Sequence, residues 1–182
     1  RLITGGPRLS LDGQPVHHHM GLSAFAEYGL VSEKSLVKIP SELGFVEASL
    51  FGCAVMCGAG TALYSAAIKP GDTIAVFGLG GVGLAAILGA RIAGATRIIA
   101  VDCNSSKKDL ALALGATDFV AAEGAAQAIR ALLSQGVDAA LDASASVEGF
   151  EQALESTRRG GSTVTVSLPE ASKQFHFPLS RL

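Results

Sequence analysis

Apolar positions follow two different patterns along the chain, and the pattern changes at the turn Pro70-Gly71-Asp72. Beyond this turn, short β-branched runs alternate with Ala/Leu-rich segments of helical spacing. The runs predict strands at Ile74–Phe77, Arg97–Val101, Asp118–Val120, Ala139–Leu141 and Ser162–Ser167. The segments between them predict helices at Val82–Ala93, Ser106–Leu114, Ala125–Leu133 and Val147–Arg158. The alternation indicates βαβ units, and uniformly apolar strands indicate a parallel sheet buried on both faces, hence an α/β fold.

The first 70 residues have a less regular pattern. Ser23–Ser32 alternates apolar and polar residues, which predicts a half-buried strand, and Leu36–Ile39 predicts a second short extended run. Ser41, followed by acidic residues, has the pattern of a capped helix start. Glycines interrupt the small-residue segment that comes next, and we expect it to become helical over Thr61–Ile68.

Composition narrows the class of protein. The 182 residues are 49% hydrophobic and 16% charged, with a mean hydropathy of +0.42 and a net charge of −2. A chain of this kind can bury a sizeable core and is not intrinsically disordered. Its 14 Lys and Arg residues are scattered rather than gathered into a stripe, so we expect no nucleic-acid partner.

Two long uncharged stretches, Ala48–Ile68 and Thr73–Ala90, have the length of a membrane span. Glycines break both stretches and small polar residues are mixed into them, so we expect neither to cross a membrane. The three cysteines, Cys53, Cys57 and Cys103, are too few for a disulfide framework in a chain of this length. Free thiols suit a reducing compartment, which predicts a cytoplasmic protein.

The most informative motif is the glycine-rich turn Gly78-Leu79-Gly80-Gly81-Val82-Gly83, which follows a predicted strand and leads into a predicted helix. In that context the GxGxxG spacing is typical of a dinucleotide site. Gly78 allows a sharp turn, Gly80 allows the backbone to approach a pyrophosphate, and Gly83 allows the helix to pack closely on the strand. The helix N-terminus adds free N–H groups and the positive end of the helix dipole.

Asp102 ends the next predicted strand, 19 residues after Gly83. An acid at this place accepts hydrogen bonds from the adenosine ribose and repels a 2′-phosphate, so the motif favours NAD over NADP. Alternatively, Asp102 only caps the helix that follows it. Lys107 either lies across the same ribose or is an ordinary solvated lysine.

Several segments together resemble the zinc-dependent alcohol dehydrogenases of the medium-chain dehydrogenase/reductase superfamily. The resemblance lies in Leu50–Gly60 (LFGCAVMCGAG), in Val76–Gly83, and in Pro15–Gly21 with Ala24–Tyr28. These segments keep the family's spacing, and the match covers nearly the whole chain.

The resemblance implies the fold and its division. Residues 53–182 are expected to form a Rossmann domain, a doubly wound parallel sheet that binds NAD and is incomplete at its C-terminus. Residues 1–52 are expected to be part of a β-rich, GroES-like catalytic domain.

The resemblance also implies that Cys53 is a ligand of a catalytic zinc ion and that Cys57 lines the nicotinamide site. Thiolate suits zinc, and a catalytic zinc site keeps one position open for water or substrate. From the residues alone, a lone cysteine is more often a small buried hydrophobe. Cys53 and Cys57 are four residues apart, so they can also share one helix face. The family's other zinc ligands have no counterpart in this chain.

The resemblance implies further residues for the substrate pocket and for the nicotinamide half of the cofactor. His19, Met20 and Leu168 are expected in the substrate pocket. Ser144, Val166 and Ser167 close predicted strands along the nicotinamide half of the cofactor; alternatively, they only end strands. The expected cofactor contacts are therefore Gly78, Leu79, Gly80, Gly81, Val82, Gly83, Asp102, Lys107, Cys57, Ser144, Val166 and Ser167.

The implied activity is reversible hydride transfer between NAD and a primary or aryl alcohol, or a thiol-adduct alcohol, with zinc as Lewis acid. We expect small-molecule alcohols and aldehydes as partners, a homo-oligomer for the full-length subunit, and no activity from this chain alone. The alternatives are a non-catalytic dinucleotide-binding module and a zinc-independent relative of the quinone-reductase type. Cys53 favours the zinc enzyme, because quinone-reductase-like relatives lack this thiol.

Overall fold

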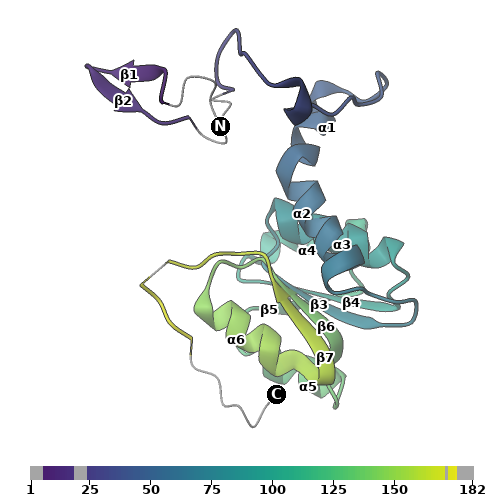
Figure 1. The fold of residues 1–182 in the computed structure, drawn as a ribbon. Coiled ribbons are helices and arrows are strands. Elements are labelled where there is room, and N and C mark those ends of the chain that lie inside the picture. Colours follow the sequence, from purple (N-terminus) through teal and green to yellow (C-terminus); the bar gives the residue numbers. More distant parts are fainter. Residues whose placement is uncertain (1–5, 19–23, 171, 176–182) are drawn as a thin grey trace. The chain divides into compact units, whose positions relative to one another are not determined.

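The computed structural model describes residues 6–18, 24–170 and 172–175, and the chain forms two compact units, residues 1–43 and 44–182. The first unit contains the antiparallel hairpin β1 (Leu9–Leu11) and β2 (Gln14–Val16), and a 3-10 turn at Glu33–Ser35 (Figure 1). Asp12 and Gly13 close the hairpin with φ angles of 51° and 76°. An Asp-Gly pair suits such a turn, because both of its central residues need positive φ.

The predicted strand at Ser23–Ser32 is wrong for the part that the structure describes. Ser23 lies outside the described residues, and residues 24–32 form no strand. Phe25, Tyr28 and Leu30 are all exposed. A strand needs a neighbour for its backbone N–H and C=O groups, and β1 and β2, the strands described in this unit, pair with each other.

A helical segment, residues 45–65, begins the second unit. It consists of α1 (Phe45–Leu50), a π-helical turn (Phe51–Val55), α2 (Met56–Gly60) and a second π-helical turn (Thr61–Ser65). The predicted start at Ser41 is wrong, because the helix begins after Gly44 without a side-chain cap. The predicted range Thr61–Ile68 begins too late, because residues 45–60 are already helical. It also runs past the end of the helix, since Ala67 has a φ of 48°.

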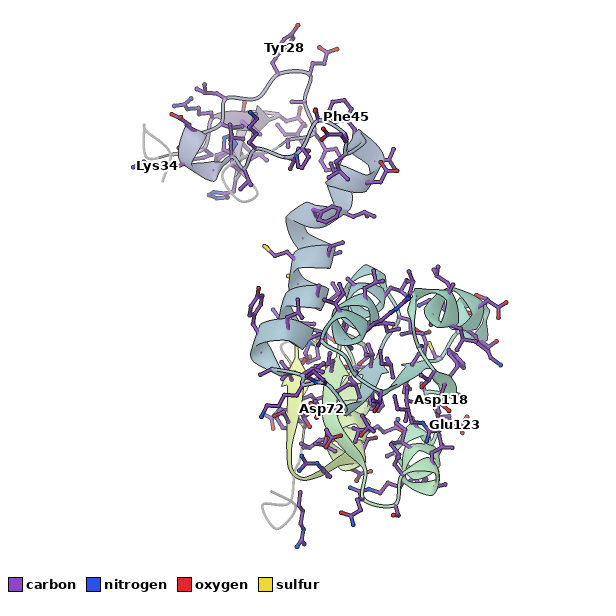
Figure 2. The ribbon with its side chains drawn as sticks, turned by 90° about the vertical axis from the view of Figure 1, so that its right-hand side faces the viewer. Tyr28, Lys34, Phe45, Asp72, Asp118 and Glu123 are labelled. Carbon is purple, nitrogen blue, oxygen red and sulfur yellow. The ribbon has the colours of Figure 1, made fainter. Side chains whose placement is uncertain are left out.

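By length and composition the helical segment 45–65 could cross a membrane, and it is the one described helix that passes that test. Phe45, at its start, is 93% exposed (Figure 2). The other uncharged stretch, Thr73–Ala90, forms a strand and most of a helix that are largely buried in the second unit.

The second unit is built on a five-stranded parallel sheet in the order β5-β4-β3-β6-β7. Its strands are β3 (Thr73–Phe77), β4 (Arg97–Asp102), β5 (Asp118–Ala121), β6 (Val137–Asp142) and β7 (Thr157–Thr165). Its helices are α3 (Gly81–Ile92), α4 (Lys108–Leu114), α5 (Ala125–Leu132) and α6 (Val147–Ser156). The predicted α/β alternation and parallel sheet are confirmed.

Helices cover both faces of the sheet, as Figure 1 shows for α2, α3 and α4 on one side and α5 and α6 on the other. Ile74 and Val76 of β3 pack in one buried cluster with α3, while Ala75 and Phe77 pack in a second cluster with α5 and α6. Side chains alternate between the faces of a strand, so a strand buried on both faces is apolar at every position.

The end of the sheet departs from the prediction at β7. Helix α6 ends at Ser156 rather than Arg158, and β7 runs over Thr157–Thr165 rather than Ser162–Ser167. The pairing with β6 jumps from Val137↔Thr157 to Ala139↔Ser162, so a bulge of extra residues lies between the two pairs. Val166 and Ser167 therefore follow the strand.

The strand order places a crevice at the carboxyl ends of the strands. From β3 the chain moves outward through β4 and β5, then returns to place β6 on the other side of β3. Ligands of open α/β sheets bind at this reversal point. Phe77, Asp102 and Asp142 end the three strands that border it.

Candidate functional site

The glycine-rich turn lies at the carboxyl end of β3. Gly78 has a φ of 83° and donates its N–H to the carbonyl of Val101 at 2.8 Å. A Cβ atom at Gly78 would come within 2.7 Å of the backbone of Ala143 and Ser144. This position therefore requires glycine both for its backbone conformation and for the close approach of the β6 end.

The remaining residues of the turn begin α3. Gly80 is the N-cap residue, is exposed, and has open space where a Cβ would stand. Gly83 is buried, and a Cβ there would collide with the carbonyl of Gly78. Leu79 is 1% exposed, Gly81 is exposed, and Val82 is half-buried. As the motif predicts, the backbone at Gly80 is open to the approach of a pyrophosphate, and Gly83 allows α3 to pack closely on the end of β3.

Asp102 is 6% exposed and its carboxylate is tied to the glycine-rich turn. Its Oδ2 accepts the N–H of Leu79 at 2.6 Å and the ammonium of Lys107 at 3.0 Å. Its Oδ1 accepts the N–H of Asn104 at 2.8 Å. Asn104, rather than Asp102, caps the turn that follows, because its side chain accepts the N–H of Ser106. The capping interpretation of Asp102 is therefore wrong.

The surroundings of Asp102 keep it ionised. Burial raises the pKa of its carboxyl, but the N–H groups of Asn104 and Leu79 and the ammonium of Lys107 together lower it below the ordinary value. Lys107 is thus an ion-pair partner of the acid rather than a lysine that points freely into solvent.

A cavity of about 330 Å³ opens beside this acid. Residues at or just after the carboxyl ends of β3, β4, β5 and β6 line it, together with the first turns of α6: Phe77, Gly78, Val101, Asp102, Cys103, Lys107, Ala122, Ala143, Ser144, Ser146, Glu148, Gly149 and Gln152. The cavity therefore lies at the crevice that the strand order predicts.

A second hollow, of about 480 Å³, is lined by residues of α5, α6 and the start of β7. Its lining contains no residue of the glycine-rich turn. Arg130 in its wall donates to the carbonyls of Glu155 and Thr157, so this guanidinium serves the end of α6. The hollow is larger, but of the two cavities it is the crevice beside Asp102 that is lined by the glycine-rich turn and the acid.

The ends of β6 and β7 meet at Asp142. This buried carboxylate accepts hydrogen bonds from the hydroxyls of Ser144, Thr165 and Ser167. Val166 donates its N–H to the carbonyl of Asp142 at 2.9 Å, so the predicted residues Ser144, Val166 and Ser167 do lie together. Sequence reasoning missed Asp142 itself, although it ends a buried apolar run just as Asp102 does.

Leu168 is 93% exposed, and His19 and Met20 lie outside the described residues. The predicted substrate pocket is therefore not assembled among the described residues. The sequence predicts a buried thiol at Cys103, and this is wrong: its thiol is free and exposed, and the residue lines the cavity next to Asp102.

Cys53 and Cys57 lie on the helical segment 45–65, and both thiols are free and exposed. A Cβ at Gly81 would lie 3.3 Å from the Cβ of Ala54, and one at Gly58 would collide with the carbonyl of Val82. The segment that carries both cysteines therefore packs against the start of α3. No three His, Cys, Asp or Glu residues come together as a metal site among the residues that the structure describes.

Comparisons with known proteins agree on one family. The profile described as zinc-binding dehydrogenase matches residues 81–182. The S-(hydroxymethyl)glutathione dehydrogenase of Synechocystis sp. is 41% identical over 175 residues, which is 93% of this chain and 47% of that protein. The chain thus spans about half the length of the curated relatives it matches.

Solved structures give the same result. An alcohol dehydrogenase zinc-binding domain protein from Burkholderia ambifaria has a TM-score of 0.87 at 35% identity, covering 93% of this chain and 46% of that one. Benzyl alcohol dehydrogenase from Acinetobacter calcoaceticus has a TM-score of 0.83 at 31% identity, covering 88% and 45%.

Proposed function

This chain belongs to the zinc-binding dehydrogenase family, and we propose that it binds NAD and serves hydride transfer between that cofactor and a small-molecule alcohol. One observation carries the proposal. The glycine-rich turn and an ionised acid meet at the carboxyl edge of the sheet, where the N–H of Leu79 donates to Asp102 at 2.6 Å. A dinucleotide needs both features, one for its pyrophosphate and one for its adenosine ribose.

The residues present fit NAD at the phosphate end. The open space at Gly80 and the start of the twelve-residue helix α3 favour a pyrophosphate there. The adenosine ribose of NAD would contact both members of the Asp102–Lys107 ion pair. The carboxylate would accept hydrogen bonds from the ribose hydroxyls, and the ammonium would donate to them. A 2′-phosphate would meet the Asp102 carboxylate, which supports a preference for NAD over NADP.

The nicotinamide half would lie along the ends of β6 and β7. Ser144, Val166 and Ser167 are gathered there by Asp142, which supports their proposed contacts with the cofactor. Cys57 is proposed to line the same half from the helical segment 45–65. His19, Met20 and Leu168 remain the proposed substrate-pocket residues.

Cys53 is proposed as one ligand of a catalytic zinc ion. Its thiol is free and exposed, as an available ligand must be, but the described residues do not form a zinc site by themselves. Zinc bound there would act as a Lewis acid on the substrate oxygen. The chain's own part is to hold the cofactor, so that a hydride can pass from the alcohol carbon to the nicotinamide ring.

The names of the relatives suggest two kinds of alcohol. S-(hydroxymethyl)glutathione is a thiol-adduct alcohol, and benzyl alcohol is an aryl alcohol. We propose a cytoplasmic, homo-oligomeric dehydrogenase for substrates of these kinds, with no nucleic-acid partner. We also propose that the helical segment 45–65 does not span a membrane, because Gly58 packs against α3 of the second unit.

The test is a binding measurement followed by an activity measurement. Purified protein is titrated with NADH and NADPH by nucleotide fluorescence, and NAD reduction is followed with S-(hydroxymethyl)glutathione and with benzyl alcohol. We expect tighter binding of NADH and turnover of at least one alcohol by the full-length subunit. Binding of neither nucleotide would reject the proposal.

A second candidate function is a dinucleotide-binding module without catalysis. Its support is that the features for nucleotide binding, the glycine-rich turn and Asp102, lie together in this chain. NADH binding without turnover of either alcohol in zinc-loaded, full-length protein would select this module over the enzyme.

A further inference from the structure

The carboxyl end of β6 holds a buried acid for which the proposed cofactor contacts have no direct use. Asp142 is 1% exposed, and no Lys, Arg or His side chain in the described ranges forms an ion pair with it. Its hydrogen-bond donors are one backbone N–H and three hydroxyl groups. A carboxylate only accepts hydrogen bonds, so these contacts fix where the hydroxyl protons point.

One oxygen of Asp142 holds the loop before α6. Oδ1 accepts the N–H of Ser144 at 3.0 Å and the hydroxyl of Ser144 at 2.6 Å. Ser144 Oγ then accepts the N–H of Ser146 at 3.3 Å, and Ser146 Oγ caps α6 by accepting the N–H of Gly149 at 2.8 Å. This side of the carboxylate therefore has a local, structural task.

The other oxygen of Asp142 holds the end of β7. Oδ2 accepts the hydroxyl of Thr165 at 2.8 Å and the hydroxyl of Ser167 at 2.9 Å. Because the Ser167 proton is committed to Asp142, its oxygen has only lone pairs left for another group. Ser167 is half-buried, so that oxygen is not sealed from a ligand.

We propose that Asp142 is a positioning residue that makes the Ser167 hydroxyl a hydrogen-bond acceptor toward the nicotinamide half of the cofactor. This inference rests on the proposed function, since β6 and β7 belong to the half of a doubly wound sheet that takes the second mononucleotide. The groups of that half which donate hydrogen bonds are the ribose hydroxyls and the carboxamide NH2. Either one matches an acceptor at Ser167.

The substitution Asp142→Asn reverses the direction of the hydrogen bonds at the position of Oδ2 and leaves those at Oδ1 as they are. The N–H of Ser144 can only donate, so the amide oxygen must take the place of Oδ1. The amide NH2 then takes the place of Oδ2 and donates toward Thr165 and Ser167. Their protons turn away from it, that of Ser167 toward a ligand or toward Thr165 Oγ1 at 3.3 Å, and the amide N–H occupies a lone pair of Ser167 Oγ that a ligand would otherwise use.

Calorimetric titration of the purified protein with NADH, ADP-ribose and AMP measures the consequence. We expect Asp142→Asn to weaken NADH binding roughly tenfold and to leave AMP binding unchanged, as the loss of one hydrogen bond would do. ADP-ribose separates the two donor groups, because it has the second ribose but no carboxamide. An equal loss for ADP-ribose assigns the ribose hydroxyls, and a loss for NADH alone assigns the carboxamide.

Two further variants separate positioning from stability. Asp138→Asn is the matched control, because Asp138 lies on the same strand at its amino end and accepts the N–H of Thr73 at 2.7 Å. It should lower stability without changing the ratio of NADH to AMP affinity. Ser167→Ala should weaken NADH binding by itself, and adding Asp142→Asn to it should change that ratio little further.

Equal weakening of AMP and NADH binding by Asp142→Asn would show a merely structural role and overturn the proposal. Unchanged NADH affinity in Ser167→Ala, or an undiminished effect of Asp142→Asn in that background, would overturn it as well. If the unaltered protein binds none of the three nucleotides, the proposed function itself fails and this inference fails with it.

Discussion

Asp102 and Asp142 end the two strands that flank β3, and their neighbours give them different tasks. Asp102 accepts from backbone N–H groups and from Lys107, and its proposed role is toward a ribose. Asp142 accepts mainly from hydroxyls and orders the strand ends around it. We therefore propose recognition for one acid and positioning for the other, although the residue type and the place at a strand end are the same.

We propose that Asp102 sets the cofactor preference, so substitution there should change it. Asp102→Gly combined with Cys103→Arg should shift binding from NADH toward NADPH, because it replaces a repelling carboxylate with a cation beside the 2′-phosphate. Fluorescence titration with both nucleotides measures the shift. Asp118→Asn is the control, since Asp118 pairs with Arg97 at the other end of the sheet and should leave the preference unchanged. Tighter binding of NADPH than NADH by the unaltered protein would contradict the assignment.

Three acids make stability depend on acidic pH. Asp118 has its pKa lowered mainly by Arg97, while burial raises the pKa of Asp102 and Asp138 but their hydrogen-bond partners lower it more. The unfolded chain therefore takes up protons at a higher pH than the native state does. The stability that these groups contribute is present above the ordinary carboxyl pKa of about 4 and is lost as pH falls through the lower native values.

Urea unfolding from pH 7 down to pH 3 tests this dependence. The free energy of unfolding should stay nearly level at the neutral end and fall below about pH 4. Asp118→Asn should flatten part of that fall. Stability that rises on acidification would show that the directions of these pKa shifts are wrong.

At the scale of elements, two glycines of the turn have separable roles. Gly83→Ala should push α3 off the end of β3, at a cost of about 1–3 kcal/mol, because its Cβ would collide with the carbonyl of Gly78. Gly80→Ala meets open space and should leave the thermal midpoint nearly unchanged, yet weaken NADH binding by filling the place of the pyrophosphate. Thermal unfolding and nucleotide titration of both variants check this. An unaffected fold in Gly83→Ala would mean that the turn does not pack as described.

The helical segment 45–65 packs closely against its neighbour α3. A Cβ at Gly89 of α3 would come within 2.8 Å of Ala59, so α2 and α3 cross at close range. Gly58 and Gly89 interrupt apolar stretches in the sequence, and in the structure they allow these helices to approach. At the other end of the segment, Phe45 and Val46 remain exposed.

At the scale of the whole molecule, the metal site is the part of the proposal that the described residues do not complete. The 182-residue chain should bind zinc weakly or not at all, because the described residues bring no three donors together. In the full-length subunit, Cys53→Ser should remove most of the zinc and the activity, whereas Cys57→Ser should leave the metal in place. Zinc content by plasma emission, measured beside the dehydrogenase rate, separates these variants. Loss of zinc in Cys57→Ser alone would move the ligand to Cys57.

The sequence by itself determined the features that depend on near neighbours. The alternation of strands and helices after Asp72 follows from side-chain periodicity, and each of the five strands predicted there overlaps one that formed. The glycine-rich turn and Asp102 were also found from sequence, because a positive φ at Gly78 and a strand-ending acid are local requirements. Asp12-Gly13 is a hairpin turn of the same local kind, which the pattern of apolar and polar positions does not reveal.

Only the tertiary structure decided the features that depend on partners far apart in the chain. Residues 24–32 have the alternation of a strand, but no described strand pairs with them. The bulge in β7 follows from its register against β6, and the grouping of Ser144, Thr165 and Ser167 around Asp142 spans up to 25 residues of sequence. Pairing and burial are formed between segments, so a periodic pattern within one segment cannot specify them.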